Sequence, residues 1–215
     1  VFGKTGVAEP VFDCILSRSS PLPYEIRKYG VRYACETEYS TSSGNDGMGF
    51  RALAGYIGVG TKPQNDGETS ISMTAPVVTA EKKGESIAMT APVVTEGIGG
   101  GMKKMQFVLP AKYDSLDKIP KPTNLNVKIT KVPAASGAVH KFSGSCDDEK
   151  GRVQVQKLIE QLKEDGMEID EGKALENYLL WRYDPPFTIP MFRRNEVWVD
   201  LSESQVDYLV NKFSN

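Results

Sequence analysis

The sequence SISMTAPVVT at residues 70–79 recurs sixteen residues later as SIAMTAPVVT at residues 86–95. Each copy is short, rich in β-branched residues and bounded by turn-forming residues, which is typical of a β-strand. The segment between them, AEKKGE at residues 80–85, is polar and has the length of a hairpin connection. The duplication therefore predicts an antiparallel hairpin. Because proline lacks a backbone donor, Pro76 and Pro92 should lie at an edge, a bulge or a strand end.

The length and composition are those of an ordinary globular protein. The chain has 215 residues, enough for one medium-sized domain or two small ones, and it is 40% apolar and 25% charged. The formal net charge of −2 gives no general electrostatic reason to bind nucleic acid. No apolar run is long enough to span a bilayer. We therefore expect a folded domain with no nucleic-acid partner and no transmembrane segment.

Cysteine and histidine limit the metal chemistry. Cys14, Cys35 and Cys146 lie far apart and form no Cys-x-x-Cys pair, which argues against a structural zinc site and a disulfide-rich secreted scaffold. A reducing compartment suits this pattern better. His140 is the single histidine, so it is the one candidate imidazole ligand for a metal. A multi-histidine metal site, or haem held by two histidines, is excluded within one chain.

Apolar spacing predicts two main helices and a helical tail. The first helix has a buried face of i, i+3, i+4, i+7 spacing and is capped by Asn45 or Asp46. The second is capped by Ser145 or Asp147 and ends at Gly166, and the tail helix follows Ser202. The residues expected on the buried faces are Phe50, Leu53, Ala54 and Ile57 in the first helix, Val155, Leu158, Ile159 and Leu162 in the second, and Val206, Leu209, Val210 and Phe213 in the tail.

Strands account for most of the remaining chain. Apolar and polar residues alternate over residues 31–39, which predicts a strand with one solvated face. The order of elements predicts an α+β fold, in which two helices pack against a mostly antiparallel, strongly curved sheet. An internal pseudo-repeat, with a helix followed by strands in each half, is compatible with this order. The other strand-like segments are residues 12–16, 24–29, 102–109, 125–132, 138–142, 178–183 and 196–201.

No linker divides the chain convincingly. We expect a loose leader at residues 1–11, a single domain at residues 12–201 and the tail helix at residues 202–215. The tail helix could dock on its own core, on a neighbouring chain or on a lipid surface, and the sequence leaves these alternatives open. A nucleophile elbow, a zinc-protease motif and a Walker loop are all absent from the sequence.

The most informative stretch for function is YDPPFTIPMFRRNEVW at residues 183–198. Large apolar side chains on this proline-stiffened loop must cover the core, a partner or a ligand. Arginine suits a carboxylate, because its planar fork can bond both oxygens. A flat, apolar ligand with acidic ends would fit this combination, and packing of the loop on its own core is the alternative. The side chains concerned are Phe187, Ile189, Met191, Phe192, Arg193 and Arg194.

Several of these motifs together resemble the SOUL haem-binding family. They are YEIRKY at residues 24–29, the glycine- and aromatic-containing helix at residues 49–57, the two MTAPV elements, YDPP at residues 183–186 and RNEVW at residues 194–198. They occur in the family's order over about residues 12–200. The doubled MTAPV and the sequence MQFVLP at residues 105–110 look most like plant and algal members, several of which are plastid proteins.

The resemblance implies a distorted, mostly antiparallel β-barrel flanked by two α-helices. This is the SOUL or gyrase-inhibitor-like effector-binding fold, with a pseudo-two-fold repeat. It also implies that haem or a related tetrapyrrole binds in an apolar cleft between the first helix and the loop before the last strand. The cleft residues carried over are Leu53, Ala54, Ile57, Phe187, Ile189, Met191, Phe192 and Arg193, and the propionate partners would be Arg51, Arg193 or Arg194.

Two departures from the family pattern bear on how haem would be held. Lys28 stands where some animal relatives have a histidine proposed as an iron ligand, and an ordinary lysine is protonated at neutral pH. Gly47 and Gly55 stand where another animal member has basic residues proposed to hold haem. Apolar burial should therefore drive haem binding, without a strong protein ligand to the iron.

These observations lead to three functional hypotheses. The first is a non-enzymatic haem carrier, buffer or sensor. The second is a haem-degrading, haem-oxygenase-like enzyme that uses the same cleft, because weakly ligated iron could accept oxygen. The third is a module that binds a small molecule or a partner. A chloroplast location is expected from the plant-like motifs, with the cytoplasm as the alternative. Association with a membrane surface and the oligomeric state remain open.

Overall fold

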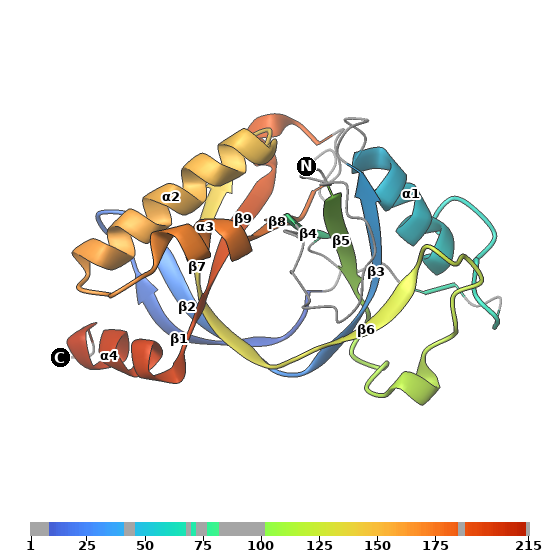
Figure 1. The fold of residues 1–215 in the computed structure, drawn as a ribbon, viewed down its shortest axis with the longest axis horizontal. Coiled ribbons are helices and arrows are strands. Elements are labelled where there is room, and N and C mark those ends of the chain that lie inside the picture. Colours follow the sequence, from blue (N-terminus) through green and yellow to red (C-terminus); the bar gives the residue numbers. More distant parts are fainter. Residues whose placement is uncertain are drawn as a thin grey trace, which may run out of the picture.

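The structure is a computed structural model that describes residues 9–40, 46–67, 70–71, 77–81, 102–184 and 188–213. Within these ranges, nine strands form one sheet, and every pairing between them is antiparallel. Their order across the sheet is β1-β2-β7-β9-β8-β4-β5-β3-β6 (Figure 1). The strands are β1 (Phe12–Arg18), β2 (Tyr24–Tyr29), β3 (Arg32–Ser40), β4 (Val77–Glu81), β5 (Met102–Val108), β6 (Lys128–Val132), β7 (Ala135–Ser143), β8 (Leu179–Arg182) and β9 (Arg194–Leu201).

The predicted helices are present, together with one that the sequence did not predict. The predicted helices are α1 (Asp46–Ile57), α2 (Asp148–Glu164) and α4 (Glu203–Phe213). The short α3 (Glu171–Asn177) was not predicted. Asp147 caps α2 by accepting a hydrogen bond from the Lys150 amide at 2.9 Å, as one of the two predicted caps. Two 3₁₀ turns, η2 (Leu116–Lys118) and η3 (Pro190–Phe192), complete the described elements. The α+β class is therefore confirmed.

The expected barrel is not closed. β1 and β6 stand at opposite ends of the strand order. β1 pairs with β2, and β6 pairs with β3. The strands of the described ranges thus form an open antiparallel sheet, which corrects the barrel predicted from the family resemblance. A barrel requires hydrogen bonds between its first and last strands, and β1 and β6 do not supply them.

The predicted pairing between the two copies of the duplicated sequence is also wrong where it can be tested. Val77 pairs with Phe107 of β5 on one side and with Arg182 of β8 on the other. Since a strand has two edges, β5 and β8 together occupy both edges of β4 at residues 77–79. The second copy at residues 86–95, with Pro92, and also Pro76 of the first copy, lie outside the described residues.

Two groups of buried side chains hold the helices against the sheet. Leu53 and Ile57 of α1 pack with Cys35 and Phe107, so α1 lies beside β3 and β5 (Figure 1). The predicted apolar face of α2 is buried against β7 and β9, in the cluster that also contains Val206 and Leu209 of α4. The tail helix therefore docks on its own core, which was one of the alternatives left open by the sequence. The α2 residues in this cluster are Val155, Leu158, Ile159 and Leu162.

A polar network ties the C-terminal end of α2 to the neighbouring elements. The carboxylate of Asp165 accepts hydrogen bonds from the Tyr24 hydroxyl at 2.6 Å and from the Arg18 guanidinium at 2.9 Å. The Lys212 ammonium of α4 donates to the Asp165 backbone oxygen at 2.8 Å. These contacts join β1, β2 and α4 to one helix end.

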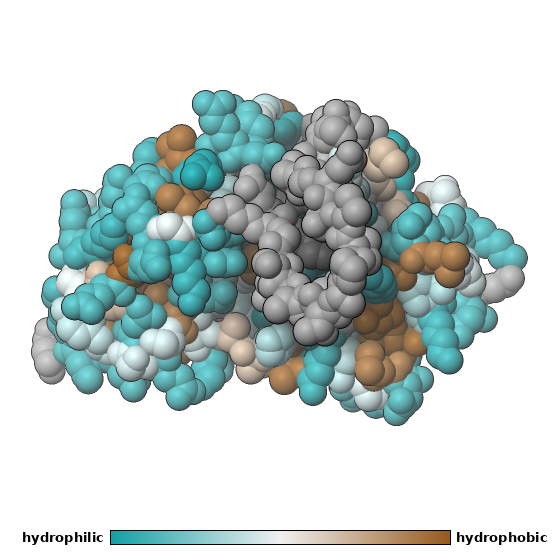
Figure 2. All heavy atoms as spheres, viewed as in Figure 1, coloured by the Kyte–Doolittle hydropathy of each residue, from teal (hydrophilic) through white to brown (hydrophobic). Residues whose placement is uncertain are grey.

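On the face shown in Figure 2, the surface around α2 and α4 is mostly hydrophilic, with hydrophobic residues in small groups. No helix in the described ranges has the length and apolarity needed to cross a membrane.

Thiol labelling should follow burial. Cys14 is exposed, whereas Cys35 is fully buried beside Phe107, and burial raises the pKa of the Cys35 thiol to about 12. Because the thiolate is the reactive form, we expect Ellman's reagent to modify Cys14 within the native protein and Cys35 only as the protein unfolds. Native-state reaction of Cys35 at the rate of Cys14, assigned by mass spectrometry of the labelled peptides, would contradict the packing of α1 on β3.

Candidate functional site

The three apolar α1 residues predicted to contact a ligand lie in the core. Leu53, Ala54 and Ile57 are all buried, and Leu53 and Ile57 belong to the cluster that contains Cys35 and Phe107. Their apolar surface is already covered by protein, so we do not retain them as contacts of the candidate site. Arg51, two positions before Leu53 on α1, is exposed. The helical spacing predicted the buried face correctly, but it could not say whether protein or ligand covers that face.

The apolar side chains on η3 are arranged differently. Ile189 is 48% exposed, Met191 is 68% exposed and Phe192 is 44% exposed. Residues with large apolar side chains are normally found inside proteins, and three of them are exposed here within four consecutive positions. These three side chains therefore do not pack fully on the protein's own core, which was the alternative to ligand binding. Phe187 lies outside the described residues. We call Ile189, Met191 and Phe192 the η3 surface.

Backbone and side-chain hydrogen bonds fix the η3 turn. Pro190 begins the turn, where its fixed φ suits the geometry, and the Phe192 amide donates to the Ile189 carbonyl at 2.9 Å. The Arg193 Nε donates to the Thr188 carbonyl at 2.8 Å, and its Nη1 lies 3.3 Å from the Ser145 Oγ. Arg193 thus connects both ends of the turn to the segment that follows β7. The η3 surface is therefore presented on an ordered support.

Arg194 is already bound to carboxylates. Its Nε and Nη2 donate to one oxygen of Glu196 at 2.9 and 2.7 Å, and its Nη1 donates to Glu9 at 2.9 Å. Its guanidinium carbon also lies 3.9 Å from the centre of the Tyr183 ring. A ligand carboxylate would have to compete with these partners, so Arg194 is a poorer propionate partner than the sequence predicted. Arg51 and the half-buried Arg193 are the other two candidates.

The carboxylate of Glu196 is the centre of a buried ion-pair cluster that sequence reasoning missed. Arg27 donates to its two oxygens at 2.8 and 3.1 Å, and the Tyr183 hydroxyl donates at 2.6 Å. The side chains of Arg27 and Glu196 are both 0% exposed. Burial alone would lower the pKa of Arg27, but the hydrogen bonds and charge of Glu196 raise it above its ordinary value. Arg27 therefore stays charged inside the protein, and we call Glu196, Arg27, Arg194 and Tyr183 the Glu196 cluster.

Four aromatic rings pack next to the Glu196 cluster on the same face of the sheet. Trp181 and Trp198 stack with their ring centres 5.3 Å apart, and Tyr29 meets both edge-on at 5.4 and 5.6 Å. Phe12 of β1 lies 5.3 Å from the Tyr29 ring and also covers the Arg27 guanidinium at 4.3 Å. The indole nitrogen of Trp198 donates to Asp200 at 2.6 Å. Charged and aromatic groups are thus packed together on the sheet face opposite α2.

His140, the single histidine, lies in the protein interior. It is 6% exposed, its Nδ1 lies 2.7 Å from the Pro23 carbonyl oxygen, and its ring stacks on Phe142. A carbonyl oxygen can only accept, so the proton of the imidazole sits on Nδ1 in this contact. Within the portion of the chain that the structure describes, no three His, Cys, Asp or Glu side chains are grouped to hold a metal ion. His140 is not exposed toward the η3 surface as an iron ligand would need to be.

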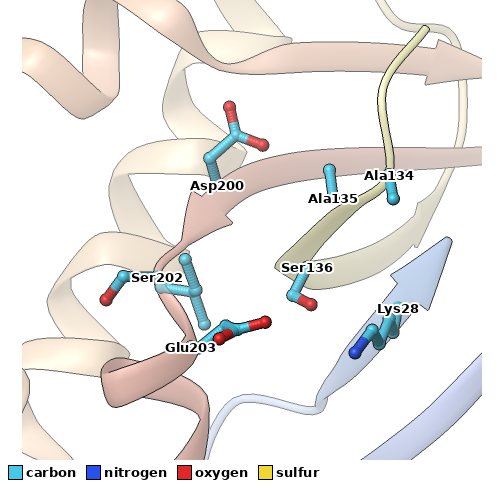
Figure 3. A pocket seen from close by; sticks show the side chains of 8 residues that line it. Lys28, Ala134, Ala135, Ser136, Asp200, Ser202 and Glu203 are labelled. Atoms are coloured by element: carbon cyan, nitrogen blue, oxygen red, sulfur yellow. The ribbon is translucent and has the colours of Figure 1, made fainter. Parts of the chain in front are cut away.

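A separate cavity of about 380 Å³ lies at the other end of β7 and β9. Figure 3 shows Lys28, Ser136 and Glu203 directed toward a common space, whereas Asp200 and Ser202 point away from it. β7 runs from this cavity to the end that carries Ser143, which pairs with Arg194 directly after η3. The cavity and the η3 surface are therefore at opposite ends of the same two strands. The lining of the cavity mixes alanine, serine and leucine with the charged residues Lys28, Asp200 and Glu203, whereas η3 presents large apolar side chains.

Comparison with solved structures identifies the same kind of fold. An uncharacterized conserved protein from Listeria innocua has a TM-score of 0.53 at 10% identity, covering 83% of this chain and 92% of that one. A hydrolase from the same organism has a TM-score of 0.52 at 11% identity, covering 83% and 91%. The C-terminal domain of EcmrR has a TM-score of 0.51 at 10% identity, covering 87% and 98%. At such identities the likeness shows the fold alone.

The chain spans 56% of the longer EcmrR chain in a DNA complex, at a TM-score of 0.49 and 11% identity. No curated protein matches this chain. The family model described as SOUL heme-binding protein matches residues 7–200, which is most of the sequence and includes the motifs at residues 24–29 and 183–198. This protein therefore belongs to the SOUL haem-binding protein family.

Proposed function

We propose that this protein binds haem, or a related tetrapyrrole, on the η3 surface and acts as a haem carrier or buffer. The observation that supports the proposal is the exposure of Ile189, Met191 and Phe192 on a turn held by hydrogen bonds. A porphyrin is flat and mainly apolar, so covering these side chains removes apolar surface of both partners from water. Membership of a haem-binding family supports haem as the ligand in general terms.

The residues around the turn fit such a ligand in part. Arg193 and the exposed Arg51 are candidate partners for the propionates, because a guanidinium can bond both oxygens of a carboxylate. The thioether of Met191 is the soft donor within the η3 surface, and methionine is a known type of axial haem ligand. His140 does not fit this role, since its ring is buried and bound to Pro23. Apolar contact would therefore provide most of the affinity.

A triple substitution tests the proposal. In Ile189→Ser, Met191→Ser, Phe192→Ser, each truncation removes a contact worth about 1 kcal/mol or more, so haemin should bind about 100-fold more weakly. The free energy of unfolding should be nearly unchanged, because the three side chains are exposed in the free protein. The measurement is a titration with haemin followed by the Soret band. Leu125, which is 95% exposed, provides a control as Leu125→Ser, and this variant should bind like the wild type.

The carrier role and the haem-degrading alternative predict different fates for bound haem. A carrier or buffer should leave the Soret band intact during incubation with haemin, oxygen and ascorbate. Haem degradation would bleach that band and release iron that ferrozine detects. Bleaching that is faster with wild-type protein than with the triple serine variant would contradict the carrier role and favour the enzyme.

We also propose two finer features that accompany this function. The element orders β3-α1-β4-β5 and β7-α2-β8-β9 are alike apart from the short α3 and η3 in the second, which supports a pseudo-two-fold repeat within the sheet. The doubled MTAPV motif supports a plastid location, and imaging of a fluorescent fusion of the protein would test it.

A further inference from the structure

The connection between β5 and β6, which includes η2, has an inner side that is fixed to the protein. Tyr113, Ile119 and Val127 of this connection are buried in the apolar cluster that α1 forms with β3 and β5. The Tyr56 hydroxyl of α1 also donates to the Pro120 carbonyl at 2.7 Å. Figure 1 shows the connection at the end of the molecule away from α2 and α4. The side chains on its outer side are therefore presented on an ordered support.

Two leucines lie on the outer side of this connection. Leu125 is 95% exposed, and Leu116, which begins η2, is 56% exposed. The Val127 amide donates to the Asn124 carbonyl at 3.0 Å, so a hydrogen bond closes the turn that carries Leu125. Glycine, proline and small polar residues dominate such turns, because they suit the turn backbone or bond to it. The two exposed leucines are therefore not explained by the conformation of their turns.

Exposed lysines accompany these leucines along the chain. Residues 110–132 contain five lysines and two aspartates, whereas the whole chain has a net charge of −2. Asp114 pairs with Lys118 at 2.9 Å, but both side chains are more than half exposed, so the pair is weak. Asp66 lies beside the connection, where its carboxylate accepts a hydrogen bond from the Lys121 backbone amide at 2.7 Å. The connection is therefore positive on a protein that is negative in total. The five exposed lysines are Lys112, Lys118, Lys121, Lys128 and Lys131.

Each part of this pattern has a simpler explanation when it is taken alone. Single exposed leucines are common, and lysines on the edge strand β6 discourage pairing with another chain. Neither explanation accounts for ordered, exposed leucines within a positive segment. A nucleic acid would use the lysines, but its phosphates would gain little from the leucines. A membrane that contains anionic lipids uses both, because lysines attract the headgroups and leucines enter the boundary with the acyl chains.

We propose that the connection between β5 and β6 docks this protein on the surface of a membrane that contains anionic lipids. Leu116 and Leu125 enter the boundary between the headgroups and the acyl chains, and the five lysines contact the headgroups. We call these seven residues the lipid-docking surface. It lies at the edge of the sheet formed by β6, whereas η3 directly precedes β9, which lies between β7 and β8. The lipid-docking surface is therefore separate from the proposed haem surface.

Co-sedimentation of the full chain with lipid vesicles tests the lipid-docking surface. We expect the wild type to bind vesicles of mixed phosphatidylserine and phosphatidylcholine at least about tenfold more tightly than vesicles of phosphatidylcholine alone. The variant Leu116→Ser, Leu125→Ser should bind the mixed vesicles about tenfold or more weakly than the wild type, because it loses both apolar anchors. The variant Lys121→Gln, Lys128→Gln should also lose about tenfold or more, because each lysine adds to the attraction.

A matched control removes an exposed apolar residue and an exposed lysine from α2. Val153 is 48% exposed, and Lys157 is exposed on the same helix. The variant Val153→Ser, Lys157→Gln should therefore bind the mixed vesicles like the wild type. Urea unfolding of each variant confirms that it is folded, which is expected because all the substituted side chains are exposed.

Several results would overturn the assignment. They are a wild type that does not bind the mixed vesicles, wild-type binding by both the leucine and the lysine variants, or an equal loss in the α2 control. Binding of polyuridylate by the wild type, without binding to vesicles, would assign the lysines to a nucleic acid and reject the lipid surface. The triple serine variant of η3 should retain vesicle binding, and the leucine variant should retain haemin binding, so the two proposals can fail separately.

Discussion

Replacing Glu196 by alanine should lower the free energy of unfolding by about 3–5 kcal/mol, because it removes the buried carboxylate that pairs with Arg27 and leaves the partly exposed Glu25 as the remaining ion-pair partner. The Glu196 carboxylate accepts hydrogen bonds from Arg27, Arg194 and Tyr183, and its side chain is 0% exposed. Truncation therefore removes the acceptor of several donors, in addition to the buried counter-charge of Arg27. Equilibrium unfolding in urea, with the m-value checked for two-state behaviour, measures the effect.

Two variants make this prediction specific. The double variant Arg27→Met, Glu196→Leu removes both charges together, so it should be more stable than Glu196→Ala even though it carries more changes. Glu164→Ala, at an exposed position near the end of α2, should change the stability by no more than about 0.5 kcal/mol. A loss below about 1 kcal/mol for Glu196→Ala would mean that Arg27 is hydrated and that the buried ion pair is described wrongly.

Leu53→Ala should cost about 2–5 kcal/mol of unfolding free energy, the usual range for truncating a fully buried leucine. Leu53 is 0% exposed and packs in the cluster that contains Phe107 and Ile57. If Leu53 contributes to the core and not to the ligand surface, the folded variant should bind haemin within about twofold of the wild type, because sites without shared contacts act independently. Urea unfolding and Soret titration of the same preparation measure both quantities.

The same helix offers a matched control for this prediction. Met48 is 53% exposed on α1, so Met48→Ala should leave the unfolding free energy within about 0.5 kcal/mol of the wild type. If Leu53→Ala instead weakened haemin binding tenfold while leaving stability intact, Leu53 would be a ligand contact. That outcome would return the haem site to the α1 cleft implied by the family resemblance.

Local patterns predicted the elements well. Helical spacing gave the buried faces of α1 and α2, and Asp147 was correctly predicted as one of two candidate caps of α2. Strand patterns found every strand outside the duplicated sequence, with ends shifted by a few residues. For example, the segment predicted as a strand over residues 125–132 begins only at Lys128, and Leu125 is 95% exposed. Such patterns succeed because they depend on neighbours in sequence.

The same sequence patterns could not predict which strands pair with each other in the sheet. The duplication suggested that its two copies pair, whereas β4 lies between β5 and β8. Nothing in a strand sequence states which strand occupies its edge. The short α3 was missed because a seven-residue helix carries little periodic signal, although Asp170 caps it.

The Glu196 cluster left a weak signal in the sequence. Glu196 stands next to the apolar run Val197-Trp198-Val199, and Arg27 follows Ile26 in a strand that proved to be largely buried. A charged residue in a strand of this kind indicates a buried pair, but its partner is known only once β2 and β9 are placed on either side of β7. The η3 side chains, in contrast, were predicted from the sequence as ligand contacts, and the structure shows that Ile189, Met191 and Phe192 are exposed.

The most direct test of the haem surface is amide hydrogen exchange with and without saturating haemin, read by mass spectrometry. If the macrocycle lies on Ile189, Met191 and Phe192, protection from exchange should increase most in peptides that cover residues 188–194, and the buried residues 53–57 of α1 should change little. Strong new protection confined to α1, with none at residues 188–194, would contradict the account and place haem elsewhere.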